Sequence, residues 1–496
     1  MNLFRSIIVV LLAATIWMPY LSAPAPAGPV FYVATNGSDS NPGSQTAPWR
    51  TIQHAANSAT AGSTVYIRGG IYAEKVMVNV SGSAAAGPIT FQSHPGEQAV
   101  IDGGGLSAAQ GENALVTVRD RAYIVLKGLE IRNLTTSSAG VVPIGISLSG
   151  ANVGVELRNN RIHHIATTYT GLVGGDAHGI AVYGDSAAAT SGLIIDGNEL
   201  FDLKLGSSEA LVVNGNVDGF TISNNLVHDT NNIAIDAIGY EGVAPANDRA
   251  RNGLIAGNRI WNVDTSTNPA YGATCSGGVC SGGETSAGGI YVDGGTLITI
   301  ERNLVIDSNI GIELASEHPG RSTDYVIVRS NIIANVDYAG IALGGYGEDP
   351  QGEGGGNARF NTIVNNTVHT PAKGAALVAQ YRVWDNTIAN NILAARSGSQ
   401  RSITDAASYL RNSEANNLLK TATSASPNPN SLFVSVARPA NADLRLKASS
   451  VGLFLHINPN SEAHNRGGPA AAGDLDFDRQ PRVAQAAIDI GADEIQ

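Results

Sequence analysis

The chain has 496 residues, of which 58 are glycine and only 15% are charged, and its formal net charge is −12. This composition favours a turn-rich β protein with one long continuous core over several small domains. The excess of acidic residues argues against nucleic acid or an anionic membrane as the main partner.

Residues 1–27 have the pattern of a secretory signal peptide. Arg5 forms the positive region, an apolar run extends from Ile7 to Trp17, and small residues from Ala25 to Ala27 offer a cleavage site. A retained anchor helix is the less favoured alternative, because the apolar run is short for a membrane span. We therefore expect a secreted or extracytoplasmic protein with no membrane contact once the signal is removed.

Residues 28–120 differ from the rest and are expected to form an N-terminal cap and the first coils of a solenoid. The sequence predicts a helix from Thr51 to Ser58 and strands at Thr64–Arg68 and Lys75–Val80. The motifs YVATNGSDSNPGS, PWRTIQHAA and GSTVYIRGGIY resemble the opening of secreted β-helix enzymes, notably polysaccharide lyase family nine and its relatives. The resemblance implies a pectate-lyase-like β-helix, whose bare end needs a cap because it would otherwise expose core and unpaired strand edge.

Residues 121–395 carry a repeat of short apolar runs separated by corners that contain asparagine. Repeats of this length made of short strands are typical of a solenoid, so we predict an all-β, right-handed parallel β-helix. Asparagine tolerates the left-handed backbone of a sharp corner, and stacked amides can bond from coil to coil. The aligned corner residues are Asn160, Asn198, Asn225, Asn258, Asn303, Asn331, Asn366 and Asn391.

A second aligned run follows each corner and predicts one strand per coil in a single parallel sheet. Its second and fourth residues are mostly Ile, Leu or Val and should point inward, so its third and fifth residues should point outward. The third-position column is Ala181, Val212, Asp236, Tyr291, Glu313, Ala342 and Leu377. The fifth-position column is Tyr183, Asn214, Ile238, Asp293, Ala315, Gly344 and Ala379.

Long insertions border this same sheet, before the aligned strand at 163–178 and 264–288 and after it at 240–252, 316–325 and 345–358. Two walls of loops beside one sheet predict a binding trough, although surface loops also tolerate insertions that have no function. Cys275 and Cys280 lie in one of these loops, and in an exported protein we expect them to form a loop-closing disulfide.

Residues 396–496 lose the repeat and are interpreted as the last coils and a C-terminal cap. The final stretch, GDLDFDRQPRVAQAAIDIGADEIQ, resembles the closing segment of many secreted bacterial β-helix proteins. We expect one domain and a monomer.

Three acids fall on consecutive coils of the outward columns: Asp236, Asp293 and Glu313. Strand spacings place Asp236 and Glu313 roughly 10 Å apart at the backbone, and each of them roughly 8 Å from Asp293. Strands disfavour Asp, and clustered like charges repel unless a cation or a shared proton offsets them. We therefore predict a functional site in which Tyr291 and His178 join the acids, with an extended polysaccharide bound by Tyr183, Asn214, Glu209, Glu241, His318 and Arg321.

Two chemistries fit these acids, and we favour the first, a Ca²⁺-assisted polysaccharide lyase, because the family resemblance is to lyases. In the first, which the resemblance implies, Asp236, Asp293 and Glu313 hold Ca²⁺, and a base removes the α-proton of a uronate for β-elimination. The base in such lyases is commonly Lys or Arg, yet no Lys lies beside the cluster. Tyr291, His178, Arg249 or Arg321 would have to serve as the base. The low number of basic residues also leaves few cations to hold a polyanion.

In the second chemistry, two of the carboxyl groups are the acid and base of a glycoside hydrolase. Carboxyl separations of about 6.5–9.5 Å suit an inverting enzyme, which needs neither Lys nor a metal ion. A third class is a non-catalytic carbohydrate-binding protein in which the acids form a structural cation site.

Overall fold

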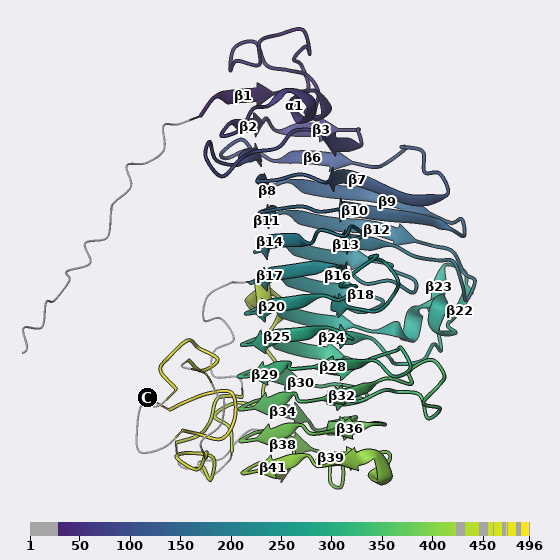
Figure 1. Ribbon diagram of the computed structural model, residues 1–496, viewed down its shortest axis with the longest axis vertical. Helices are drawn as coiled ribbons and strands as arrows, with labels where there is room; N and C mark the ends of the chain where they lie inside the picture. Colours follow the sequence, from purple (N-terminus) through teal and green to yellow (C-terminus); the bar gives the residue numbers. More distant parts are fainter. Residues whose placement is uncertain are drawn as a thin grey trace, which may run out of the picture.

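The computed structural model describes residues 28–422, 432–445, 455–459, 461–468, 473, 475–482 and 488–495. The chain winds into coils stacked along the long axis of the molecule (Figure 1). The predicted right-handed parallel β-helix is confirmed, and the expected signal peptide lies outside the described residues. Within these residues no helix has both the length and the apolar character that crossing a lipid bilayer requires.

Three parallel sheets line the coils in the described part of the chain, with 17, 12 and 11 strands. The 11-stranded sheet consists of β4 Val76–Val78, β7 Gly111–Arg119, β10 Val141–Ser149, β13 His178–Gly184, β16 Leu211–Gly215, β19 Ile235–Ile238, β24 Gly288–Asp293, β27 Ile310–Ala315, β31 Ala339–Leu343, β35 Ala375–Ala379 and β39 Arg401–Ile403. The 12-stranded sheet consists of β3 Gly70–Tyr72, β6 Ala99–Asp102, β9 Glu130–Thr136, β12 Arg161–Thr167, β15 Glu199–Leu203, β18 Leu226–Thr230, β21 Arg259–Val263, β26 Leu304–Ser308, β30 Ile332–Ala334, β34 Thr367–Thr370, β38 Ile392–Ala395 and β42 Leu418–Thr421.

The 17-stranded sheet covers the remaining side of the cylinder. It consists of β1 Val30–Val33, β2 Thr64–Ile67, β5 Ile89–Ser93, β8 Ile124–Lys127, β11 Glu156–Arg158, β14 Thr190–Asp196, β17 Val217–Ser223, β20 Arg251–Ala256, β25 Thr296–Glu301, β28 Ser322–Asp324, β29 Ile327–Arg329, β32 Asn357–Arg359, β33 Thr362–Val364, β36 Val383–Trp384, β37 Thr387–Ala389, β40 Tyr409–Leu410 and β41 Ser413–Ala415.

The predicted asparagine ladder runs through the corners between the 17- and 12-stranded sheets. Each amide Nδ2 donates to the Oδ1 of the next Asn at 2.9–3.0 Å, from Asn160 to Asn391 and one coil further to Asn417. The prediction that these residues adopt the left-handed conformation is wrong. The positive φ belongs to the preceding residue, such as Asn159 at 52° and Asn224 at 52°. The ladder residue itself turns its amide inward, where it is fully buried.

The N-terminal end is closed as predicted by a short helix, α1 Ile52–Ser58, whose N-cap Thr51 accepts a hydrogen bond from the backbone N–H of His54. Ile52, Ala55 and Ala56 are buried against the first coils and belong to the continuous core of the cylinder. The helix therefore covers apolar side chains that the first coil would otherwise expose.

The described C-terminal segments, which include α2 Asn441–Arg445, lie beside the cylinder (Figure 1). Their apolar residues Phe433, Leu444 and Ile490 pack with Trp261 and Ile306 on the outer face of the 12-stranded sheet. These segments thus cover a flank of the cylinder that reaches the last coil, where Leu418 and Ala422 pack against the same cluster.

The predicted outward columns hold on most coils, but the register of the last one is wrong by one residue. Leu377 pairs with Ile341 and lies in the core, while Val378 pairs with Ala342. Because side chains alternate along a strand, Gln380, and not Ala379, then points outward. The run AALVAQ contains no glycine, whereas each of the other aligned runs contains at least one. Its alanines are small enough to fit either the inward or the outward positions, so the sequence does not fix the register.

Candidate functional site

A groove of about 610 Å³ lies over the outer face of the 11-stranded sheet, above β24, β27, β31 and β35. Three of the five predicted loop insertions, 264–288, 316–325 and 345–358, supply lining residues. The lining consists of Ser207, Ile233, Ala270, Tyr271, Glu284, Thr285, Ser286, Tyr291, Ile310, Glu313, Glu317, Tyr338, Tyr346, Glu353 and Gln380.

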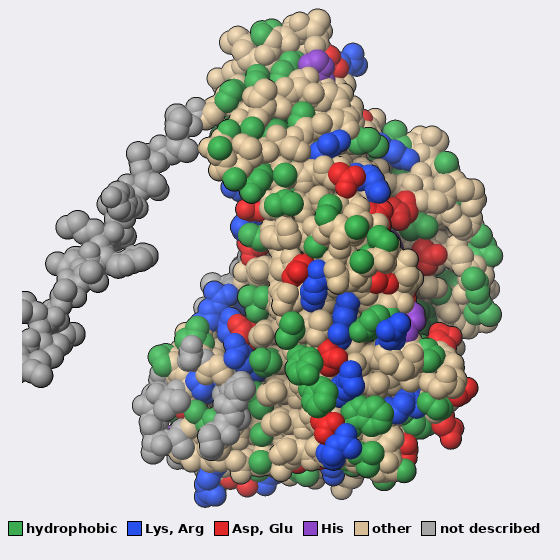
Figure 2. Space-filling view, viewed as in Figure 1, with side chains coloured by type: hydrophobic (Ala, Val, Ile, Leu, Met, Phe, Trp, Pro, Cys, Tyr) green, Lys and Arg blue, Asp and Glu red, His purple; other side chains and the backbone are tan. Residues whose placement is uncertain are grey.

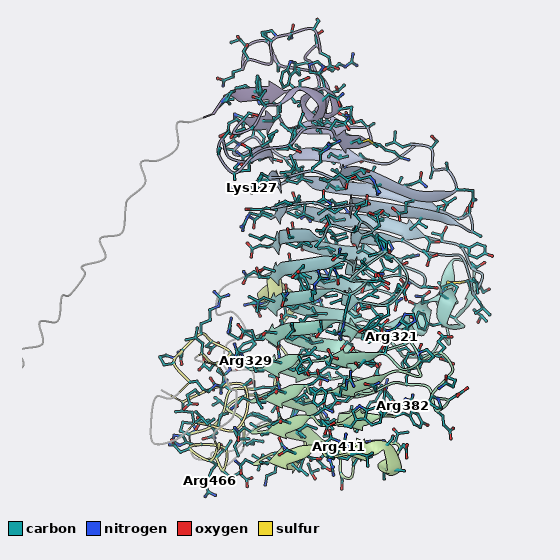
Figure 3. All side chains as sticks on the ribbon, in the orientation of Figure 1. Lys127, Arg321, Arg329, Arg382, Arg411 and Arg466 are labelled. Atoms are coloured by element: carbon teal, nitrogen blue, oxygen red, sulfur yellow. A yellow bond between two sulfur atoms is a disulfide. The ribbon has the colours of Figure 1, made fainter. Side chains whose placement is uncertain are left out.

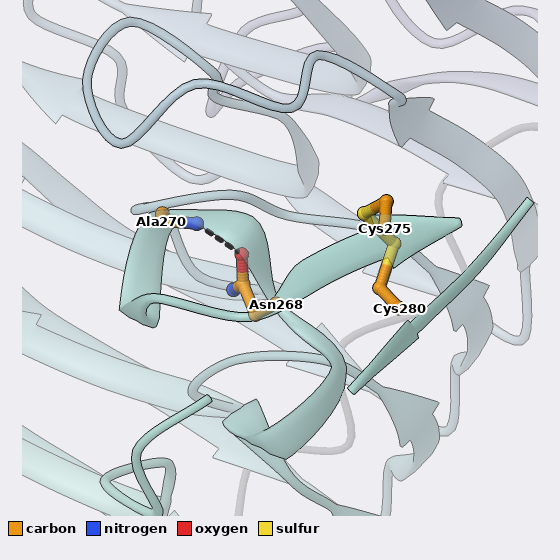
Figure 4. The surroundings of a disulfide bond; sticks show 4 residues. All are labelled: Asn268, Ala270, Cys275 and Cys280. Atoms are coloured by element: carbon orange, nitrogen blue, oxygen red, sulfur yellow. Dashed lines mark hydrogen bonds between the residues drawn. A yellow bond between two sulfur atoms is a disulfide. The ribbon is translucent and has the colours of Figure 1, made fainter. Parts of the chain in front are cut away.

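The first wall is the insertion 264–288, which contains η1 Thr265–Thr267, η2 Pro269–Tyr271 and the hairpin β22 Thr274–Ser276 and β23 Val279–Ser281. The predicted disulfide between Cys275 and Cys280 closes this hairpin. Asn268 accepts a hydrogen bond from the backbone N–H of Ala270 (Figure 4) and donates to the carbonyls of Gly206 and Asn231. The wall is thereby fixed to earlier coils, which places Tyr271 over the groove.

The second wall is the loop 345–358, which carries Tyr346 and Glu353. Arg382 supports it from behind, because its guanidinium donates to the carbonyls of Gly356 at 2.9 Å and Gly354 at 3.1 Å. This arginine, labelled in Figure 3, therefore holds the wall and is not among the residues that line the groove.

The predicted column of Asp236, Tyr291 and Glu313 is in register on β19, β24 and β27. The flanking Ile290 and Val292 belong to the core, so the three column residues point away from the interior of the cylinder. They are nevertheless only 2%, 4% and 6% exposed. The predicted outward direction is therefore correct, but these side chains are buried and do not face open solvent.

Burial raises the pKa of two carboxyl groups in the groove lining, those of Glu313 and Glu317. It raises the pKa of Glu313 to about 8, helped by the charge of Glu317 and opposed by the Gln380 amide. Burial, and then the charges of Glu241 and Glu353, raise the pKa of Glu317 to about 7. Two carboxyl groups that line one groove therefore titrate near neutral pH, where one can carry a proton while the other has lost it.

Asp236 and Asp293 are not among the groove-lining residues. Burial raises the pKa of Asp236 well above its usual range, as do the charges of Glu209 and Asp293. Burial and the charge of Glu317 also raise the pKa of Asp293 well above its usual range. The Asp293 carboxylate accepts a hydrogen bond from the backbone N–H of Glu317 at 2.8 Å. Asp293 thus fixes the start of the loop that carries Glu317.

Tyr291 lies in the groove floor, where its hydroxyl makes no close hydrogen bond among the described residues but lies near enough to the Glu317 carboxylate to lower the pKa of that group. Burial raises its pKa well above the usual range, with a further contribution from the charge of Asp293. Its hydroxyl therefore stays protonated and suits a hydrogen-bond donor, not the base that the lyase hypothesis would ask of it.

His178, Tyr183 and Glu209 form a separate polar group next to the groove, on the earlier coils. The His178 ring nitrogens lie 3.1 Å from the Glu209 carbonyl oxygen and 3.4 Å from the Tyr183 hydroxyl. Burial lowers the pKa of His178 to about 4 and raises that of Glu209 to about 8. Asn214 pairs with Tyr183 on the neighbouring strand and is buried. None of these four residues lines the groove itself.

The predicted basic residues lie to one side. Arg249 donates to the carbonyls of Gly294, Gly295 and Ser322 and to Asp324 at 2.6 Å, so it is fully engaged as a structural residue. Arg321, labelled in Figure 3, is exposed and lies over the ring of Tyr240 at 4.9 Å. Within the described chain, the groove lining contains four glutamates and neither Lys nor Arg. On the face viewed in Figure 2, by contrast, acidic and basic side chains are interspersed.

The ligand atoms closest to a metal-binding arrangement here belong to Glu241, Asp293 and His318, which lie within 4.8 Å of one another. Only Asp293 is shared with the predicted ligand set of Asp236, Asp293 and Glu313. Calcium takes six to eight oxygen ligands, so a set with one imidazole and two carboxylates fits it poorly. The His318 Nε2 already lies 3.3 Å from Glu241.

Four further residues line the groove to which the sequence analysis assigns no role: Glu317, Gln380, Glu284 and Glu353. Glu317 lies two residues after β27, outside the aligned strand, so strand periodicity could not place it. Gln380 was hidden by the register error. Glu284 and Glu353 lie in the insertions, whose charged residues were the available signal.

Comparison with known sequences supports the architecture. Residues 31–243 match the family of Pel9A-like right-handed β-helix regions, and residues 144–351 match the family of right-handed β-helix regions. The chain is 39% identical over 368 residues to the uncharacterized protein YwoF of Bacillus subtilis (strain 168), a match that covers 74% of this chain and 75% of that protein.

Two further relatives are more distant. Pectate lyase PEL9 of Emericella nidulans is 28% identical over 225 residues, which cover 41% of this chain and 50% of that protein. The structure of the GH136 lacto-N-biosidase from Eubacterium ramulus matches with a TM-score of 0.53 at 14% identity, covering 79% of this chain and 68% of that one. A likeness at that identity concerns the fold alone.

Proposed function

From the premise that this chain belongs to the pectate-lyase-like family of right-handed β-helix proteins that includes YwoF, we propose that it hydrolyses glycosidic bonds of an extended polysaccharide outside the cytoplasm. One observation carries the proposal: Glu313 and Glu317 line the same groove, with pKa values raised to about 8 and about 7. Groups poised this way suit general acid–base catalysis near neutral pH.

The two glutamates take different roles because their pKa values differ. Glu313, protonated at neutral pH, donates its proton to the glycosidic oxygen as the bond to the anomeric carbon breaks. Glu317, once ionised, removes a proton from the water that attacks that carbon. Tyr271 and Tyr346 offer ring faces to the sugars from the two walls. Asp293 lies behind the lining and accepts a hydrogen bond from the backbone N–H of Glu317, which fixes the start of the loop that carries this residue.

The test is a screen of the secreted protein on anionic, neutral and amine-bearing polysaccharides, with and without a chelator. Hydrolysis releases reducing ends without the near-ultraviolet absorbance of an unsaturated uronate, and the chelator has no effect. Glu313→Gln is expected to abolish the release. Retention of polymer in an affinity gel without any cleavage would instead identify a carbohydrate-binding protein.

A second candidate is a metal-assisted polysaccharide lyase. It is favoured by the identity to pectate lyase PEL9 and by the grouping of Glu241, Asp293 and His318. Against it stand the poor fit of that ligand set to calcium and the engagement of Arg249 in structural hydrogen bonds. Absorbance that rises on pectate and disappears with chelator would establish this candidate in place of the hydrolase.

A further inference from the structure

The charge of the groove limits what it can bind. Glu284, Glu313, Glu317 and Glu353 all line it, from the floor and both walls, while the described lining contains no basic residue. A polyanionic chain would add its own carboxylates to this acidic lining, in which Glu313 alone is assigned a proton at neutral pH. Like charges in a partly enclosed site repel strongly, because water screens them poorly there.

The groove also contains a buried polar atom without a partner. The side chain of Gln380 lines the groove and is more than nine-tenths buried, and its Oε1 atom has no hydrogen-bond partner in the described part of the chain. An unpartnered buried polar atom is costly, so this atom points to a ligand that supplies a hydrogen bond. The amide oxygen of Gln380 only accepts, so its ligand must offer an N–H or O–H donor.

We propose that the glycan bound in this groove carries protonated amino groups, as an extended hexosamine polymer with free amines does. The inference rests on the proposed function, since it names the substrate class of the same groove. An ammonium group supplies three donors and a positive charge, which meet both the acceptor at Gln380 and the surrounding carboxylates. A neutral glycan offers hydroxyl donors without a positive charge, and a polyuronate adds negative charge.

This assignment has a consequence that neutral glycans do not share. A cation beside a carboxyl group favours its ionised form, so binding lowers the pKa of Glu317, the proposed base, and releases protons near pH 7. By linkage, affinity for the amine-bearing chain then depends on pH in the range in which Glu317 titrates.

Isothermal titration calorimetry of the full chain tests the proposal at pH 7 in two buffers of different ionisation enthalpy. The probes are a glucosamine hexamer, its N-acetylated counterpart and a galacturonate hexamer. We expect the glucosamine hexamer to bind at least tenfold tighter than either of the others, with proton release. Glu353→Gln, on the groove rim, should weaken its binding severalfold. Glu156→Gln, on β11 of the 17-stranded sheet, should leave it unchanged.

Equal or tighter binding of the acetylated or galacturonate hexamer, or binding without proton release, overturns the inference. An equal loss of affinity in Glu353→Gln and Glu156→Gln also overturns it, because the overall negative charge of the protein would then explain the binding. Binding is measured without cleavage, so the two proposals fail separately. Hydrolysis of neutral glycans without amine preference leaves the function standing, whereas tight amine binding without hydrolysis leaves only the inference.

Discussion

The asparagine ladder and the groove are both rich in buried polar groups, but they treat them in opposite ways. Along the ladder each buried amide is hydrogen-bonded to the next and to a backbone carbonyl, as Asn258 is to Asn303 and to Ile222. Around the groove, Gln380 in its lining and Asp236 behind it each leave a buried oxygen atom without a partner, and buried carboxyl groups lie near one another. The hydrogen bonds of the ladder stabilise the coils. The unpaired polar groups of the groove reduce stability, and a bound ligand can supply the hydrogen-bond partners that they lack.

The largest expected effect falls on the chemistry. Glu313→Gln and Glu317→Gln each remove one member of the proposed acid–base pair, and such groups contribute about 10²–10⁴-fold to rate. We expect kcat to fall within that range for each variant on the substrate that the screen identifies. Glu156→Gln, far from the groove, is the matched control. If both groove variants keep the wild-type rate, the pair has been assigned wrongly.

The next effect falls on the ladder. Asn258→Ala removes one buried amide and leaves the amide of Asn225 and the backbone N–H of that residue without their acceptor. Buried groups left unpaired cost about 1–3 kcal/mol each, so the free energy of unfolding should drop by about 3 kcal/mol or more. Denaturant unfolding measures this, with the exposed Asn57→Ala as control. A loss below about 1 kcal/mol would show that the ladder contributes little.

Stability should also depend on pH through the groove. The pKa of Glu313 is about 8 in the folded chain against an ordinary value of 4.5, so the folded state binds the proton more tightly. That contribution is fully present below the unfolded value and is lost as pH rises through about 8. We expect the Tm of the wild type to fall over this interval, and the Tm of Glu313→Gln to fall less steeply. Identical slopes would mean that Glu313 titrates normally.

The smallest effect is expected from Tyr291→Phe. This substitution deletes a buried hydroxyl that makes no close hydrogen bond in the described chain, so the free energy of unfolding should change by less than about 1 kcal/mol. Affinity for the glycan should nevertheless fall. A large loss of stability would place Tyr291 with the ladder residues and remove the contrast between the two regions.

Sequence reasoning found most of the fold because its signals were local and repeated. The eight aligned asparagines predicted the ladder, and the alternation around Tyr291 predicted which side chains leave the core. It failed where the signal was not periodic. AALVAQ contains no residue that fixes a register, so Gln380 was missed, and the backbone conformation of the corner was assigned one residue late. The burial of Asp236 and Glu313 depends on loops whose packing no periodicity reports.

The central claim is that Glu313 and Glu317 titrate near neutral pH because the walls of the groove bury them. A carboxyl-carbon NMR titration of the protein labelled at glutamate tests this most directly. The account predicts a glutamate signal with a midpoint near 7 that disappears in Glu317→Gln and one near 8 that disappears in Glu313→Gln, while the signal of Glu209, also near 8, remains in both variants. Midpoints near the ordinary 4.5 for both residues would contradict it.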